Sequence, residues 1–176
     1  ESPEGAMALA RAYLAAGDAG RAKALVSRVW REERLDKDVE RQFLANFQSL
    51  LSRADHKRRM DMLLYAERVT DAGRVVGMAG AKALYAARAA VIRNEGNAAK
   101  LLSAVPKAER ADPGYRLALI EYNRKHDKVE EAAQLLIDAP RDIDALVDPD
   151  AWWNERRIVA RDLLDLGKPK LAYRVA

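Results

Sequence analysis

The chain has 176 residues, of which 49% are hydrophobic and 33% are charged, and its 31 Lys and Arg against 27 Asp and Glu leave a net charge of +4. Ala and Leu dominate the apolar share, and because these residues lose little on entering a helix, the composition favours a helical protein. The sequence contains no cysteine, which excludes disulfides, thiolate metal sites and cysteine nucleophiles. No apolar run reaches the length of a membrane span, so no transmembrane segment is predicted in this stretch of chain.

Helix-starting and helix-ending residues divide the chain into short segments. Ser2-Pro3, Asp112-Pro113 and Asp148-Pro149 each place a capping side chain before a proline at the first helical position. Pro106 and Pro140 each close a helix. Together with apolar residues at helical spacing, these signals predict helices over 3–16, 19–34, 37–52, 56–70, 74–94, 97–105, 113–125, 128–138, 149–166 and 169–176.

Two of these predictions depend on single residues. The predicted helix over 74–94 contains Gly77 and Gly80, and since glycine inside a helix costs about 1 kcal/mol relative to alanine, we interpret both as points where a neighbouring helix comes close. A kink or joint is the alternative. Further on, Asp127 and Glu130 match the spacing of a capping box and support a helix start there.

An internal repeat is visible in the sequence. Residues 98–106 read AAKLLSAVP and residues 132–140 read AAQLLIDAP, a spacing of 34, and an Asp-Pro pair follows each copy. Gly17 and Gly167 mark two further turns, each followed by a predicted helix. Periods in this range indicate helix pairs that stack on their neighbours. The sequence therefore predicts an all-α solenoid of antiparallel helix pairs, tetratricopeptide-like, forming one continuous domain over residues 1–176.

Motifs for chemistry are missing from the sequence. His56 and His126 lie 70 positions apart without acidic residues at metal-ligand spacing, and no phosphate-binding, dinucleotide-binding or nucleophile motif is present. The basic run 56–59 is flanked by acids and lacks interleaved aromatics, unlike a nucleic-acid platform. We therefore predict no cofactor, no metal and no nucleic-acid partner.

Trp152 and Trp153 are the most informative side chains. Each has an arginine four positions later, Arg156 and Arg157, close enough on a helix for the guanidinium to lie over the indole. Because tryptophan is a large core residue, we interpret both rings as structural wedges between successive helix pairs. Direct stacking on a sugar is the alternative.

The segment from Ala151 to Ala176 resembles the helical region that precedes the catalytic domain in soluble lytic murein transglycosylases. Residues 52–65 and the small-residue helix after Arg74 are similar to the same region. In the C-terminal segment a Trp pair, an Arg pair, an Ala-Arg and a late Ala-Tyr surround a Gly turn. The matching positions are Trp152, Trp153, Glu155, Arg156, Arg157, Ala160, Arg161, Gly167, Ala172 and Tyr173.

The resemblance implies a periplasmic parent enzyme that cleaves peptidoglycan glycan strands and leaves a 1,6-anhydro end. Its catalytic glutamate lies in a Glu-Ser motif followed by a Gly-Leu-Met-Gln segment, whereas the Glu-Ser at residues 1–2 of this chain is followed by Pro3 and lacks that segment. The resemblance thus implies a non-catalytic superhelix that positions glycan strands for its own catalytic domain. We expect this chain to be a fragment, with that domain beyond Ala176, and Arg156, Arg157 and Arg161 to contact glycan. A tetratricopeptide-like adaptor that binds a protein or peptide is the alternative.

Overall fold

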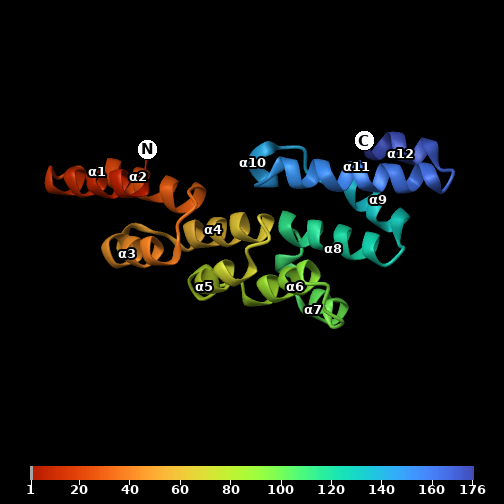
Figure 1. Ribbon diagram of the computed structural model, residues 1–176, viewed down its shortest axis with the longest axis horizontal. Helices are drawn as coiled ribbons and strands as arrows, with labels where there is room; N and C mark the ends of the chain where they lie inside the picture. The colour runs from red at the N-terminus through yellow and green to blue at the C-terminus, as the bar shows by residue number, and fades with distance from the viewer. Residues whose placement is uncertain (1) are drawn as a thin grey trace. The chain divides into compact units, whose positions relative to one another are not determined.

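The computed structural model describes residues 2–176, which form an all-helical protein without strands (Figure 1). None of the helices in this described range is long and apolar enough to cross a membrane. The prediction of an all-α fold is confirmed. The helices are α1 (Pro3–Ala15), α2 (Ala19–Glu32), α3 (Lys37–Phe47), α4 (Arg53–Tyr65), α5 (Val69–Ala79), α6 (Lys82–Ile92), α7 (Ala98–Ala104), α8 (Pro113–Lys125), α9 (Val129–Ile137), α10 (Ile143–Leu146), α11 (Pro149–Asp165) and α12 (Pro169–Val175), with 3₁₀ turns η1 (Gln48–Leu50) and η2 (Lys107–Glu109).

The chain divides into two compact units. The first unit comprises the residues up to Leu63 together with Thr70–Ala81, and the second comprises Leu64–Val69 together with Lys82–Ala176. Helices α1 to α3 belong to the first unit, and helices α6 to α12 belong to the second. One continuous domain over residues 1–176 stays a prediction.

The proline-marked helix starts are confirmed. The Ser2 hydroxyl accepts a hydrogen bond from the Gly5 N–H at 3.1 Å and begins α1. Asp112 caps α8 by accepting from two backbone N–H groups, and Asp148 caps α11 in the same way. These side chains satisfy N–H groups that the first helical turn leaves without partners.

Helical hairpins recur along the chain, and their first helices end in the same way. After α11, the Gly167 N–H donates to the Leu164 carbonyl at 2.9 Å and the Lys168 N–H donates to the Leu163 carbonyl at 2.8 Å, which is a Schellman motif. The same pair of bonds closes α1, α6 and α8, and each of these helices then packs against the next one. The left-handed residues at the four ends are Gly17, Asn94, Asp127 and Gly167, with φ of 77°, 53°, 59° and 69°. The repeat-like character of the sequence therefore has a local structural basis.

The prediction of one helix over 74–94 is wrong. The helix breaks at Gly80, whose φ of 65° suits glycine, so that α5 ends and α6 begins there. The Arg53 guanidinium occupies the space that a side chain on Gly80 would need, and it donates to the Ala79 and Gly80 carbonyls at 3.1 and 2.9 Å. Gly77 has open space around it, so no neighbouring helix approaches it. Gly80 is therefore a joint between α5 and α6. The group that comes close to it is the Arg53 side chain and not a neighbouring helix.

Two smaller differences concern helix boundaries. Asp127 is the left-handed residue after α8, and Lys128 precedes α9 without a side-chain capping bond, so the predicted capping box is absent. The four-residue helix α10 was not predicted, although Asp142 caps it through the Ala145 N–H at 3.2 Å. One turn of helix is too short to show a hydrophobic period.

The core of the second unit forms around Trp152. This side chain is 1% exposed, and its indole N–H donates to the Leu146 carbonyl at 3.1 Å and to the Tyr65 hydroxyl at 3.3 Å. A buried indole N–H needs such partners. Packed with Trp152 in this core are Leu117, Ile120, Ala132, Ala133, Leu136, Ala139, Val159, Leu163, Ala172 and Val175.

Candidate functional site

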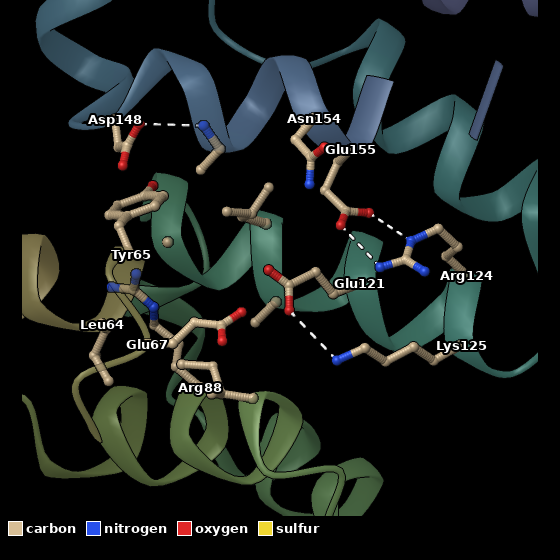
Figure 2. A pocket seen from close by; sticks show the side chains of 15 residues that line it. Leu64, Tyr65, Glu67, Arg88, Glu121, Arg124, Lys125, Asp148, Asn154 and Glu155 are labelled. Carbon is tan, nitrogen blue, oxygen red and sulfur yellow. Dashed lines mark hydrogen bonds and ion pairs between the residues drawn. The ribbon is translucent and has the colours of Figure 1, made fainter. Parts of the chain in front are cut away.

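A polar cavity of about 340 Å³ lies within the second unit (Figure 2). We call it the α8–α11 cavity, because most of its wall comes from these two helices. Its size falls at the lower end of the range for small-molecule sites. It is lined by Leu64, Tyr65, Glu67, Arg88, Ile92, Gly114, Leu117, Ala118, Glu121, Arg124, Lys125, Asp148, Ala151, Asn154 and Glu155.

An ion pair joins the two main helices of the cavity. The Arg124 guanidinium on α8 donates to both carboxylate oxygens of Glu155 on α11, at 2.7 and 2.9 Å. Glu155 is buried, and the two hydrogen bonds from Arg124 fix the position of its carboxyl group. The same contact raises the pKa of Arg124 further above its ordinary value. In the cavity wall, Glu155 is therefore held in place by its ion pair with Arg124.

Glu121 lies one turn before Lys125 on α8, and its carboxyl group points into the cavity (Figure 2). The Lys125 Nζ is 3.9 Å from this carboxyl group, too far for a hydrogen bond. Burial, together with the nearby negative charge of Glu155, raises the pKa of Glu121 to about 7. Glu121 therefore exchanges its proton near neutral pH, which is common for carboxyl groups at functional sites.

The other cations of the wall have structural partners. Arg88 is buried, with its guanidinium 4.7 Å from the centre of the Tyr65 ring, and it packs so closely on Gly114 that a side chain there would collide with it. The Lys125 Nζ donates to the Val91 carbonyl at 3.3 Å. Both cations hold helices of the second unit in place.

Sequence reasoning missed this cavity. Glu121 follows Leu117 by one helical turn, and Leu117 is a core residue of α8. An acidic residue that continues an apolar stripe is the one signal that could have marked Glu121 in advance. Its neighbour Glu155 is 34 positions away, and no spacing rule connects them.

The half-buried Arg156 side chain has structural partners. Its guanidinium donates to the Val175 carbonyl at 2.7 Å and to the Leu136 carbonyl at 2.8 Å. These carbonyls belong to the last turns of α12 and α9, where helices leave carbonyl groups without intrahelical partners. Arg156 therefore ties two helix ends to α11, and its contact with glycan stays a prediction.

We expect Arg156→Met to destabilise the protein by about 1–2 kcal/mol, because it leaves two partly buried carbonyl groups without a charged donor. Urea denaturation followed by circular dichroism would measure the change. Arg157→Met is the matched control, since Arg157 is exposed and donates to the side chain of Asn154, on the same helix, at 2.8 Å. Equal stability of the two variants would contradict the structural role.

The two adjacent tryptophans have different environments. Trp152 is 1% exposed, whereas Trp153 is 56% exposed. The interpretation of both rings as buried wedges is wrong for Trp153, because consecutive helical residues point about 100° apart and only one of them faces the core. Arg157 and Arg161 follow Trp153 at four-residue steps and are exposed too. We call these three residues the Trp153 face.

The histidines lie apart. His56 is buried against Trp30 in the first unit, with ring centres 5.5 Å apart, and burial lowers its pKa. His126 in the second unit is exposed, with its Nδ1 2.8 Å from the Tyr122 carbonyl. Among residues 2–176, no three or more His, Asp or Glu side chains are grouped so that they could hold a metal ion.

Comparisons with known proteins do not assign a family. No protein-family model matches this sequence, and no match was found among curated proteins or among solved structures. The resemblance of residues 151–176 to lytic transglycosylases therefore stays an expectation. Function has to be proposed from the residues themselves.

Proposed function

We propose that this chain is a non-catalytic α-superhelical module of a soluble lytic murein transglycosylase in the periplasm. In this role it positions peptidoglycan strands for an attached catalytic domain, expected beyond Ala176, that makes 1,6-anhydromuramyl ends. The observation that carries the binding role is the exposed Trp153 ring beside Arg157 and Arg161.

The Trp153 face has the chemistry that a glycan strand needs. An indole ring that is 56% exposed offers a flat apolar surface on which a sugar ring can stack. The guanidinium groups of Arg157 and Arg161 donate hydrogen bonds and carry positive charge, which suits the hydroxyl groups and carboxylates of peptidoglycan. Burial of both tryptophans was the main argument against sugar stacking, and for Trp153 that argument no longer applies.

The superhelical arrangement is part of the proposal. Four hairpins that close with the same Schellman motif support a stack of equivalent units. The sequence repeat agrees with this, because its two copies, residues 98–106 and 132–140, fall on α7 and α9. The Asp-Pro pair that follows each copy begins α8 and α11. Each copy thus combines a short helix, a connector and a long helix.

Retention on purified sacculi tests the binding role. We expect the chain to be retained at low salt and less at moderate salt, because screening weakens attraction between exposed charges. Trp153→Ala should reduce retention about 3- to 10-fold, the size of one stacking contact. Tyr173→Ala, which removes an exposed aromatic ring on α12 outside the Trp153 face, is the control.

No retention of the unaltered chain at either salt concentration would contradict the binding role. Equal losses in Trp153→Ala and Tyr173→Ala would contradict the assignment to the Trp153 face. Zymography should show no clearing by this chain, since the Glu-Ser motif with its downstream segment is missing from the sequence. Clearing would place catalysis within these residues.

An adaptor function is the second candidate, and the exposed leucines of α11 and its end favour it. Leu164 and Leu166 are more than half exposed, and apolar side chains suit a peptide better than a sugar. The reading frame after Ala176 discriminates between the two functions. A Glu-Ser followed by a Gly-Leu-Met-Gln-like segment supports the transglycosylase module, whereas further repeats or a stop support the adaptor.

A further inference from the structure

In the α8–α11 cavity the positively charged side chains have partners in the protein, whereas one carboxyl group lacks a hydrogen-bond donor among residues 2–176. Its three cations are engaged with the protein: Arg124 with Glu155, Lys125 with the Val91 carbonyl, and Arg88 over the Tyr65 ring. The negative groups are less well matched. The described part of the chain places no hydrogen-bond donor on the Glu121 carboxyl group, and its nearest cation is the Lys125 Nζ at 3.9 Å.

The remaining wall combines further acceptors with an apolar surface. Each oxygen of Glu155 accepts one hydrogen bond from Arg124 and keeps another lone pair. In the view of Figure 2, the Glu121 carboxyl group appears between the carboxyl groups of Glu155 and Glu67. The apolar lining residues are Leu64, Ile92, Leu117, Ala118 and Ala151.

A cation of the right kind would complete this site. A metal ion would need several convergent carboxylate or imidazole ligands, and residues 2–176 offer no such group of three. An alkylammonium ion needs one carboxylate for its charge, one or two acceptors for its N–H groups, and an apolar wall for its carbon chain. The cavity supplies each of these.

We propose that the α8–α11 cavity binds a small primary amine, with its protonated ammonium group on the Glu121 carboxylate and its alkyl chain against the apolar wall. This cavity would bind its ligand through a carboxylate, whereas the Trp153 face would bind sugar through an indole ring and two arginines. The proposal therefore does not depend on glycan binding.

The position of Glu121 makes binding depend on pH. With a pKa of about 7, Glu121 is mostly protonated at pH 5.5 and mostly ionised at pH 8, so the ammonium group should bind about 30-fold more weakly at the lower pH. The charged groups that act on Glu121 are Glu155 from α11, Arg124 and Lys125 from α8, and Arg88 from α6. Glu67 and Asp148 also line the cavity.

Three ligands with the same carbon chain test the proposal: butylamine, 1-butanol and butanoate. Titration of each into the ¹⁵N-labelled chain, followed by amide NMR signals from α8 and α11, gives an affinity and a location. We expect butylamine to bind at least about tenfold more tightly than butanol at pH 8, as one charged hydrogen bond allows, and butanoate to bind most weakly. Equal binding of the three, or a preference for butanoate, would overturn the proposal.

Glu121→Gln separates the charge from the shape of the cavity. This substitution keeps the side chain's size and should reduce butylamine affinity at pH 8 at least about tenfold, to the level of butanol. Glu131→Gln, which changes an exposed acid on α9 outside the cavity, should leave the affinity unchanged. Unaltered binding in Glu121→Gln, or equal butylamine affinity of the natural chain at pH 5.5 and pH 8, would also overturn it.

Discussion

Replacement of Arg59 by Met is expected to destabilise the first unit by about 3 kcal/mol, the lower end of the range for breaking a buried ion pair. Arg59 is 0% exposed. Its Nε and Nη2 donate to Glu40 at 3.2 and 2.8 Å, and its Nη1 donates to the Trp30 and Glu33 carbonyls at 2.9 and 3.2 Å. The substitution leaves these acceptors buried without that donor.

A second arginine limits the loss. Arg74 donates to the other Glu40 oxygen at 2.7 Å, so Glu40 keeps one cation when Arg59 is removed. The guanidinium also lies 4.4 Å from the centre of the Trp30 ring, a contact that Met replaces in part with its apolar side chain. These two compensations place the expected loss near 3 kcal/mol rather than 5.

Urea denaturation followed by circular dichroism and tryptophan fluorescence would measure this effect, with Trp30 as the reporter of the first unit. Arg41→Met is the control, because Arg41 pairs with Asp38 on an exposed face and should change stability by less than about 0.5 kcal/mol. The double replacement of Glu40 and Arg59 by Met should recover part of the loss, since it also removes the Glu40 oxygen that Arg59→Met leaves buried without its donors. A loss below 1 kcal/mol for Arg59→Met would contradict the buried network.

Glu121→Gln is expected to stabilise the second unit at pH 8 by about 3 kcal/mol, the free energy that corresponds to a pKa raised from 4.5 to about 7. The folded state binds the Glu121 proton more tightly than the unfolded state does. The natural chain therefore has the full contribution below pH 4.5 and loses it as the pH rises towards 7. Glutamine stays neutral and does not lose it.

Urea denaturation at several pH values between 4.5 and 8 would test this prediction. The stability difference between Glu121→Gln and the natural chain should be close to zero at pH 4.5 and largest above pH 7, while groups shared by both proteins cancel. Glu131→Gln should show no such dependence. A Glu121→Gln protein that is less stable than the natural chain at pH 8 would mean that Lys125 and Arg124 favour the ionised carboxyl group more than burial disfavours it.

Much of the helical structure follows from local signals. The helix predicted over 113–125 matches α8 at both ends, because Asp112 and Pro113 start it and the chain turns at Asp127. The break at Gly80 was not predictable from spacing. The residues around a glycine do not reveal whether it lies inside a helix or ends one. At this break the carbonyl groups are bound by Arg53, which lies 27 positions before Gly80.

The candidate sites were less predictable. Helical spacing separates Trp152 from Trp153 and Arg156 from Arg157 onto different faces, but it does not tell which face meets the core. Packing of α9 and α12 on α11 makes that choice, since Arg156 reaches the ends of both helices while Arg157 stays exposed. The raised pKa of Glu121 likewise depends on its burial and on Glu155, which α11 brings near it.

By itself, the sequence determined that this protein is helical, where most helices begin and that similar units recur along it. These properties arise from capping side chains, prolines and the apolar period, which act within a few residues of one another. Only the tertiary structure decided that Trp152 is buried and Trp153 exposed, that Arg156 ties two helix ends to α11, and that Glu121 and Glu155 share one cavity. Burial and charge interactions depend on which surfaces meet, and residues far apart in the chain supply those surfaces.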